Sequence, residues 1–167
     1  MQPSSPLPII REAYEADADE VLRLAYLMWD EIGLETTNQP WEHQYRAVFS
    51  RACTSTQGRI LVAQHPNDTE RVVACGTAWV HQLLPAPWLP TGNLGYLQWF
   101  FTEPAWRGQH LARTIAQDLI AWLRNRGCPR VHLHAALKAK PLYDGLGFET
   151  TRYENLWLDQ TTSDQGA

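Results

Sequence analysis

Apolar and polar positions follow two different periods along the chain, and the changes of period mark the predicted elements. A spacing of three to four residues predicts helices, while alternation or a short apolar run predicts strands. The predicted elements are a strand at residues 9–11, helices at 17–33 and 40–52, strands at 59–64, 71–81 and 95–102, a helix at 111–126, a strand at 130–135, a short helix at 138–146, and two short strands within 148–158.

Residues that start and stop helices support several of these boundaries. Asp17 and Glu20 have the spacing of a capping box, in which each side chain binds a backbone N–H of the first turn. Pro40 suits the first turn of the second helix. Gly33 and Gly127 predict helix ends, because glycine readily adopts the left-handed conformation found there.

The order of the elements predicts a mixed sheet. The strand at 95–102 is nearly continuous in apolar residues, as expected for a strand covered on both faces. The helix at 111–126 connects it to the strand at 130–135, and such a crossover joins parallel strands. The strands before it read as hairpins. We therefore expect an α/β fold with a mixed, mostly antiparallel central sheet flanked by helices.

The length fits one domain over residues 1–167. We expect its core at about residues 9–158 and a flexible polar tail at 159–167. Eight tryptophans are many for this length, and we expect most of them to contribute to the core. The segment 83–93 combines three prolines with Trp88, so it is expected to pack over the sheet edge. A pocket wall or a homodimer contact is the alternative for this loop.

Charge and composition exclude several classes of protein. The net charge is −4, and the fourteen Lys and Arg residues are scattered rather than gathered on one face, which argues against a nucleic-acid partner. No stretch approaches the roughly 20 apolar residues of a membrane span, and the N-terminus lacks the pattern of a signal peptide. Three widely spaced cysteines do not form a secreted disulfide framework. We expect a soluble, cytoplasmic protein.

The most informative segment is Arg107-Gly108-Gln109-His110-Leu111-Ala112, between the strand at 95–102 and the helix at 111–126. A loop of small and polar residues that enters a helix directs unpaired backbone N–H groups at one point, with the positive end of the helix dipole behind them. This arrangement predicts an anion-binding loop. A second notable segment, Leu142-Tyr143-Asp144-Gly145-Leu146-Gly147-Phe148, follows about thirty residues later.

The two segments resemble conserved blocks of the GNAT superfamily of acetyl-CoA-dependent N-acetyltransferases. The first is similar to its motif A, [Q/R]-x-x-G-x-[G/A], and the second to its LYxxLGF block. The element order resembles that of the family over residues 9–158. His110 stands where motif A has the glycine that precedes its [G/A] position, and Ala136 stands where the family usually has an asparagine. His110 is tolerated if the backbone there is helical, and otherwise it weakens cofactor binding.

The resemblance implies where acetyl-CoA binds. The backbone of Gly108, Gln109, His110, Leu111, Ala112 and Arg113 would hold the pyrophosphate. The side chain of Arg107 either contributes to this site or has a structural role. Phe100, Phe101 and Thr102 match the end of the family's fourth strand, where a bulge separates it from the next strand. Backbone groups freed there would bind the pantetheine amides as an added strand does.

The resemblance also implies the reaction, in which an acetyl group moves from acetyl-CoA to a primary amine by direct attack through a tetrahedral intermediate. Tyr143 matches the tyrosine that protonates the departing thiolate in this family. No residue stands out as the base for the amine. Glu31 ranks first as a catalytic base, ahead of Glu35, Glu103 and His81. The acceptor is a small-molecule or peptide amine, which the acidic net charge favours.

One other interpretation remains open, and a metal site is considered and not predicted. The departures at His110 and Ala136 would also suit a catalytically weak acyl-CoA-binding sensor or regulatory module. His132 and His134 would lie on one side of a strand, but a third ligand at a suitable spacing is missing, so we predict no metal site.

Overall fold

The computed structural model describes residues 6–36, 41–152, 156 and 158. The contacts divide the chain into two compact units, Met1–Ala135 and Ala136–Ala167, and each is described by itself. The single domain over residues 1–167 stays a prediction. The predicted tail at 159–167 lies outside the described residues.

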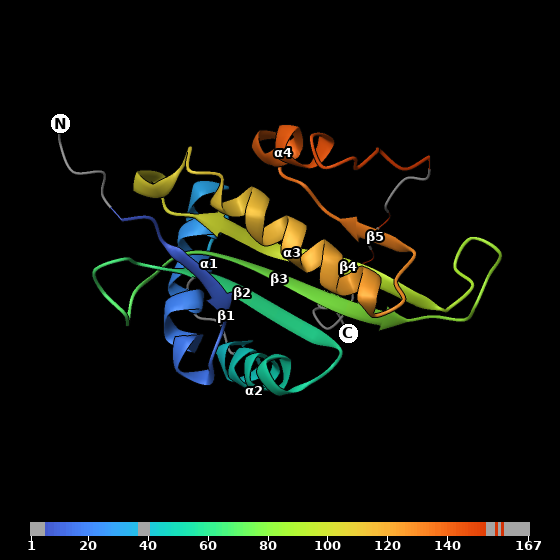
Figure 1. Ribbon diagram of the computed structural model, residues 1–167, viewed down its shortest axis with the longest axis horizontal. Coiled ribbons are helices and arrows are strands. Elements are labelled where there is room, and N and C mark those ends of the chain that lie inside the picture. Colours follow the sequence, from blue (N-terminus) through green and yellow to red (C-terminus); the bar gives the residue numbers. More distant parts are fainter. Residues whose placement is uncertain (1–5, 37–40, 153–155, 157, 159–167) are drawn as a thin grey trace, which may run out of the picture. The chain divides into compact units, whose positions relative to one another are not determined.

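The first unit contains five strands and three helices (Figure 1). Three short 3₁₀ turns also occur in the chain, at Glu15–Asp17, Pro104–Trp106 and, in the second unit, Leu137–Ala139. The elements of the first unit are β1 (Ile9–Glu12), α1 (Ala18–Glu31), α2 (Trp41–Thr54), β2 (Gly58–Gln64), β3 (Val72–Gln82), β4 (Asn93–Thr102), α3 (Leu111–Asn125) and β5 (Arg130–Leu133).

The strands form one sheet in the order β1-β2-β3-β4-β5. The first three pairings are antiparallel, and β4 pairs with β5 in parallel. The parallel pair follows from the connection, because α3 carries the chain back to the edge from which β4 started. These observations confirm the predicted mixed, mostly antiparallel sheet flanked by helices.

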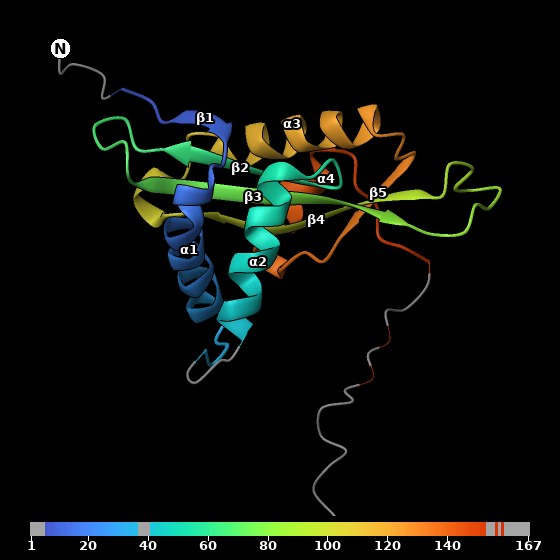
Figure 2. The same ribbon diagram turned by 90° about the horizontal axis from the view of Figure 1, so that it is seen from below.

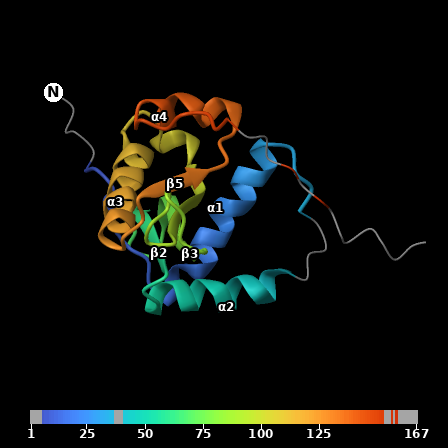
Figure 3. The same ribbon diagram turned by 90° about the vertical axis from the view of Figure 1, so that its right-hand side faces the viewer.

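Helices cover both faces of this sheet (Figures 2 and 3). Helix α3 lies on one face, and α1 and α2 lie on the other. The close packing of α3 requires small residues on the strands, since a Cβ added at Gly76 would lie 2.7 Å from Ile115 Cγ2 and one at Gly95 would lie 2.9 Å from Leu123 Cδ1. The opposite face holds a core of α1, α2 and strand residues that includes Leu24, Phe49 and Phe101.

The second unit contains α4 (Lys140–Asp144), which follows the turn at Leu137–Ala139. The helix is shorter than the predicted segment 138–146, because its first turn is 3₁₀ and Gly145 begins the turn that ends it. Residues 148–152 lie in neither a helix nor a strand, so they do not form the predicted late strands. Residues 153–155 and 157 of that prediction lie outside the described residues, as does Pro40, the expected start of α2.

The predicted capping box of Asp17 and Glu20 is wrong. The Asp17 carboxylate instead accepts hydrogen bonds from the Arg11 guanidinium at 2.7 and 2.9 Å and from the Tyr14 N–H at 2.7 Å. Glu20 binds the Arg23 guanidinium and the Val72 N–H. The Asp17 carboxylate therefore binds the preceding turn and β1, and the Glu20 carboxylate connects α1 with β3. Burial raises the pKa of Asp17, but the bonds from Arg11 and Tyr14 outweigh it and hold that pKa below its usual value.

The three cysteines are free thiols in the structure. Burial raises the pKa of Cys53 and of Cys128, and it raises the pKa of the fully buried Cys75 to about 12. Within the part of the chain that the structure describes, no helix has both the length and the apolarity that crossing a membrane requires.

Candidate active site

A β-bulge interrupts the ladder between β3 and β4. Cys75 pairs with Phe101 and Thr77 pairs with Gln98, so β4 contains one more residue than β3 between these pairs. Trp99, inside the bulge, has a φ of 56°, in the left-handed region that favours glycine. Two β3 side chains bind the bulge, since Thr77 Oγ1 donates to the Gln98 carbonyl at 2.8 Å and Cys75 Sγ to the Trp99 carbonyl at 3.4 Å.

Strands β4 and β5 part directly before this bulge. Their parallel register runs from Leu94–Arg130 to Leu97–Leu133, whereas β4 continues to Thr102. β5 therefore ends two residues earlier than the predicted strand at 130–135. A strand that runs past its neighbour offers an edge where an extended ligand with amide groups can add as another strand. We call the place where the two strands part the fork.

The loop after β4 has two residues in the left-handed conformation. Gly108 has a φ of 79°, and His110, the N-cap of α3, has a φ of 61° and a ψ of 13°. Left-handed residues beside a helix start turn successive backbone N–H groups into an anion-binding concavity. Space remains above the loop, because a Cβ added at Gly108 would meet no atom within 4 Å.

The backbone at His110 is therefore left-handed and not helical. In this conformation a side chain is less favourable than glycine, so the condition under which His110 was expected to be tolerated is not met. Histidine is nevertheless among the residues that enter the left-handed region more readily than most. Its side chain is exposed, so the imidazole is not packed inside the loop. A positive φ explains why glycine suits this position.

Arg107 links three parts of the first unit. Its Nε donates to the Thr102 carbonyl at 3.0 Å, and its Nη2 donates to Glu31 Oε2 at 2.5 Å. The guanidinium also lies 5.6 Å from the centre of the Phe101 ring. This side chain thus joins the end of β4, the end of α1 and the anion-binding loop.

The contact with Arg107 bears on the role of Glu31. A carboxylate held by a guanidinium is a poor proton acceptor, because the pairing favours its ionised form. The catalytic role of Glu31 stays a prediction. Glu103, another candidate base, is buried and forms ion pairs with Arg23 at 2.8 Å and Arg71 at 2.9 Å. Glu35 is exposed.

The remaining predicted cofactor residues lie along β4 and the first turn of α3. Phe101 and Leu111 are buried, and Phe100, Thr102, Gln109, Ala112 and Arg113 are half-buried. The hydroxyl oxygen of Thr102 is buried without a hydrogen-bond partner among the described residues. An unpartnered buried hydroxyl beside the anion-binding loop is the feature expected of a group that binds a ligand.

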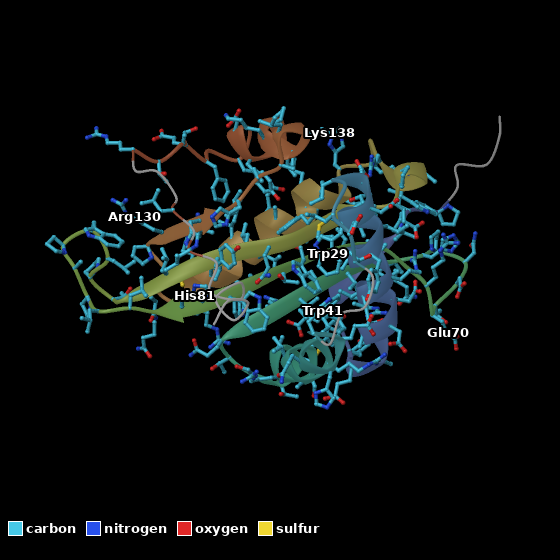
Figure 4. All side chains as sticks on the ribbon, turned by 180° about the vertical axis from the view of Figure 1, so that it is seen from behind. Trp29, Trp41, Glu70, His81, Arg130 and Lys138 are labelled. Carbon is cyan, nitrogen blue, oxygen red and sulfur yellow. The ribbon has the colours of Figure 1, made fainter. Side chains whose placement is uncertain are left out.

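An aromatic cluster lies on the sheet face that α1 and α2 cover (Figure 4). Trp29 contacts Trp41 and Trp99 edge to face, with ring centres 5.1 and 5.2 Å apart. Tyr45 stacks on Trp99 at 5.5 Å. The sequence indicated core tryptophans but not this grouping, because the three residues come from three separate elements.

The second unit contains Tyr143 on α4. Its side chain is buried, and its ring centre lies 5.7 Å from that of Phe148. The Tyr143 carbonyl accepts hydrogen bonds from the N–H groups of Leu146 and Phe148, each at 3.0 Å. Burial raises the pKa of Tyr143 to about 12, so the phenol keeps its proton near neutral pH.

Among the described residues, no three or more His, Cys, Asp or Glu side chains are placed to hold a metal ion. The binding and catalytic roles of the predicted site residues stay predictions, while their positions in the first unit gather around the fork and the loop that follows β4.

Comparison with known proteins connects this geometry to a family. Residues 23–148 match the model of the acetyltransferase (GNAT) family. A glucosamine 6-phosphate N-acetyltransferase from Trypanosoma brucei brucei is 33% identical over 55 residues, which are 33% of this chain and 37% of that protein. The aligned segment thus spans just over a third of the curated relative.

Solved structures share the fold. A predicted acetyltransferase with acetyl-CoA from Clostridium acetobutylicum has a TM-score of 0.80 at 22% identity, covering 90% of this chain and 95% of its own. A GCN5-related N-acetyltransferase from Ralstonia eutropha JMP134 has a TM-score of 0.77 at 20% identity, covering 90% and 97%. With the family model matching most of its length, the chain belongs to the acetyltransferase (GNAT) family.

Proposed function

We propose that this protein transfers an acetyl group from acetyl-CoA to a primary amine by direct attack through a tetrahedral intermediate. The observation that carries the proposal is the succession of a bulged strand, a fork and an anion-binding loop within a chain of this family. The three features follow one another along β4 and the start of α3. They suit a long ligand that has amide groups at one end and phosphates at the other.

Acetyl-CoA fits the residues that are present. The backbone of residues 108–113 would hold its pyrophosphate, and the edge of β4 from Phe100 to Thr102 would hold its amide groups. The unpartnered hydroxyl of Thr102 supports this assignment. When bound, acetyl-CoA supplies the activated acetyl thioester. Arg107 serves as a positioning residue, because its guanidinium is engaged by Thr102 and Glu31.

Tyr143 is the proposed acid for the departing thiolate. Its position in the LYxxLGF-like segment supports the role, and its phenol carries a proton at neutral pH, as a donor to the thiolate must. A positioned acid of this kind typically contributes about 10²- to 10⁴-fold in rate.

The acceptor is a primary amine, and glucosamine 6-phosphate is the first candidate because a curated relative is named for acetylating it. The net charge of −4 favours amines in their cationic state. We propose a panel of glucosamine 6-phosphate, ethanolamine, spermidine and L-phenylalanine, which vary in charge and size.

The test combines a binding measurement with a turnover measurement. Acetyl-CoA is titrated into the protein while tryptophan fluorescence is recorded, and free thiol release is then followed with each amine. Binding with amine-dependent thiol release supports the transferase. Binding without release favours the acyl-CoA sensor, which the departures at His110 and Ala136 would suit. Absence of acetyl-CoA binding overturns both.

Replacing Tyr143 by Phe should lower kcat by about 10²-fold or more while changing acetyl-CoA affinity by less than about twofold. The phenol acts on the departing sulfur and not on ligand binding. Steady-state kinetics and the fluorescence titration measure the two effects. Tyr14→Phe, at an exposed tyrosine, is the matched control. Equal losses in kcat and affinity would instead indicate a packing role.

A further inference from the structure

Three histidines and a tyrosine gather beside the fork. The Tyr96 and His132 rings lie 4.6 Å apart, and the Tyr96 hydroxyl lies 3.3 Å from His134 Nδ1. His81, from β3, is 5.4 Å from Tyr96 and 6.2 Å from His132 between ring centres. His134 is the residue directly after the last β4–β5 pair, Leu97–Leu133. We call these four residues the histidine cluster.

The register places the histidine cluster on the face of α1 and α2. Tyr96 pairs directly with Trp79 on one side and with His132 on the other, so the three side chains share a face. Trp79 packs against the core that includes α2. Gly95, the neighbour of Tyr96, faces α3 instead. Figure 4 shows His81 on this face, the same side as Trp29 and Trp41.

The two faces of the sheet differ in how tightly they are packed beside the histidine cluster. On the opposite face α3 packs closely, because Gly76 and Gly95 leave no room for even a Cβ. On the face of α1 and α2, His81 and His134 are exposed and His132 is half-buried. In the proposed reaction, an amine that enters from this side would find these imidazoles beside the fork.

The proposed reaction needs a group that accepts a proton from the attacking amine, and no such group has been assigned. Alkylamines are protonated near neutral pH, and imidazole is the side chain that best accepts a proton there. Burial, together with His81 and His134, lowers the pKa of His132, so that ring stays neutral beside its neighbours. Arg130, on the same strand, lies over the Trp88 ring at 5.6 Å. Among the described residues, the charged groups that lower the pKa of His132 are the imidazoles of His81 and His134.

We propose that His134 is the base that deprotonates the attacking amine, and that Tyr96 positions it by accepting a hydrogen bond from His134 Nδ1–H. This assignment rests on the proposed acetyl transfer. With Nδ1 carrying a proton, the ring lone pair that takes the proton lies on Nε2. The sequence analysis considered His132 and His134 only as metal ligands, predicted no metal there, and did not connect them with Tyr96 or with the base.

His134 Nε2 takes one proton from the ammonium, leaving the electron pair on nitrogen. That pair forms the new bond to the carbonyl carbon while the carbonyl π pair moves onto oxygen. When the oxygen pair returns, the carbon–sulfur bond breaks with its pair on sulfur, and the sulfur takes a proton from Tyr143. The second nitrogen proton passes through water to the Tyr143 oxygen, and His134 releases its proton to water, so ammonium and thioester give amide, thiol and one proton.

The first arm of the test compares wild type, His134→Gln, Tyr96→Phe and His43→Gln between pH 6 and pH 9, with the best amine of the panel. His134→Gln should lower kcat/KM at pH 7 by about 10²- to 10⁴-fold, with acetyl-CoA affinity unchanged within about twofold. The loss should shrink as the pH rises, because a larger share of the amine is then already neutral. Tyr96→Phe should give a smaller loss, and exposed His43 on α2 should give none.

The second arm does not depend on turnover. Nitrogen NMR of histidine-labelled protein at pH 8 should show the Nδ1–H tautomer at His134, and Tyr96→Phe should shift that ring toward the Nε2–H form. An Nε2–H tautomer in the wild type overturns the assignment. So does an active wild type whose His134→Gln variant keeps its kcat/KM and pH profile. A wild type that binds acetyl-CoA but acetylates no amine overturns the proposed function itself, and the base role with it.

Discussion

At several positions in this protein, the local backbone conformation explains the role of a residue better than its side-chain type does. His110 occupies a left-handed position where the family motif has glycine. The motif could be recognised from the sequence, but the conformation could not, because helical and left-handed backbones are both open to a histidine at a helix start. The capping box of Asp17 and Glu20 failed for a related reason. Arg11 reaches Asp17 from β1 and Val72 reaches Glu20 from β3, which requires the folded sheet, while Arg23 binds Glu20 within α1.

His110→Gly should raise the free energy of unfolding by about 0.5–1 kcal/mol. Glycine removes the cost of holding a side-chain-bearing residue in the left-handed conformation, which is about 1–2 kcal/mol. Part of this gain is lost because glycine also gives the unfolded chain more conformational entropy. Urea unfolding measures the change. His43→Gly, within α2, should lower stability by about 1 kcal/mol, so the same substitution has opposite signs at the two sites. A destabilised His110→Gly would contradict the assigned backbone.

At the scale of elements, β4 could be predicted from the sequence, but its bulge could not, because the bulge depends on how β4 pairs with β3. The strand's limits follow from its apolar run, but the extra residue at the bulge depends on its alignment with β3. The histidine cluster was missed for the same reason. His81 is about fifty residues away from His132, and only the β3–β4–β5 register brings them together.

Thr77→Val should lower stability by about 1 kcal/mol and weaken acetyl-CoA binding. The hydroxyl holds the Gln98 carbonyl within the bulge, and its loss leaves that carbonyl without its donor. Urea unfolding and the fluorescence titration measure both effects. Thr54→Val is the control, since the Thr54 hydroxyl only binds carbonyls of its own helix. Unchanged affinity in Thr77→Val would show that the bulge does not shape the ligand site.

The Arg107–Glu31 contact joins the end of α1 to the anion-binding loop. If Glu31 acts only through this contact, Glu31→Gln and Arg107→Gln should be non-additive in kcat/KM, and the double variant should resemble the worse single one. Both side chains are partly exposed, so the coupling in stability should stay below about 1 kcal/mol. A further large loss in kcat when Glu31→Gln is added to Arg107→Gln would support the predicted base role.

At the scale of the whole molecule, the order of elements and the mixed sheet were readable from the sequence, because crossover and hairpin connections fix strand direction. The late strands were not, since residues 148–152 form neither helix nor strand. The two specific segments identified the family that the family model then confirmed.

Acetyl-CoA at about 100 times its Kd should raise the Tm by about 5–10 °C. A ligand that binds only the folded state contributes about 2.7 kcal/mol at that excess, and 1 kcal/mol shifts a chain of this size by about 2–4 °C. Thermal unfolding followed by circular dichroism measures the shift. Acetate at the same concentration should give none, and an unchanged Tm with acetyl-CoA would argue against the proposed donor.

The three thiols, two of them buried and that of Cys53 half-buried, make this protein convenient for a colorimetric assay. Disulfide reagents such as Ellman's compound react with thiolates, and Cys53, Cys75 and Cys128 all have pKa values raised by burial. The folded enzyme should therefore consume such a reagent slowly. Coenzyme A released during turnover would be detected continuously over a low background, and a sudden rise in that background would report unfolding.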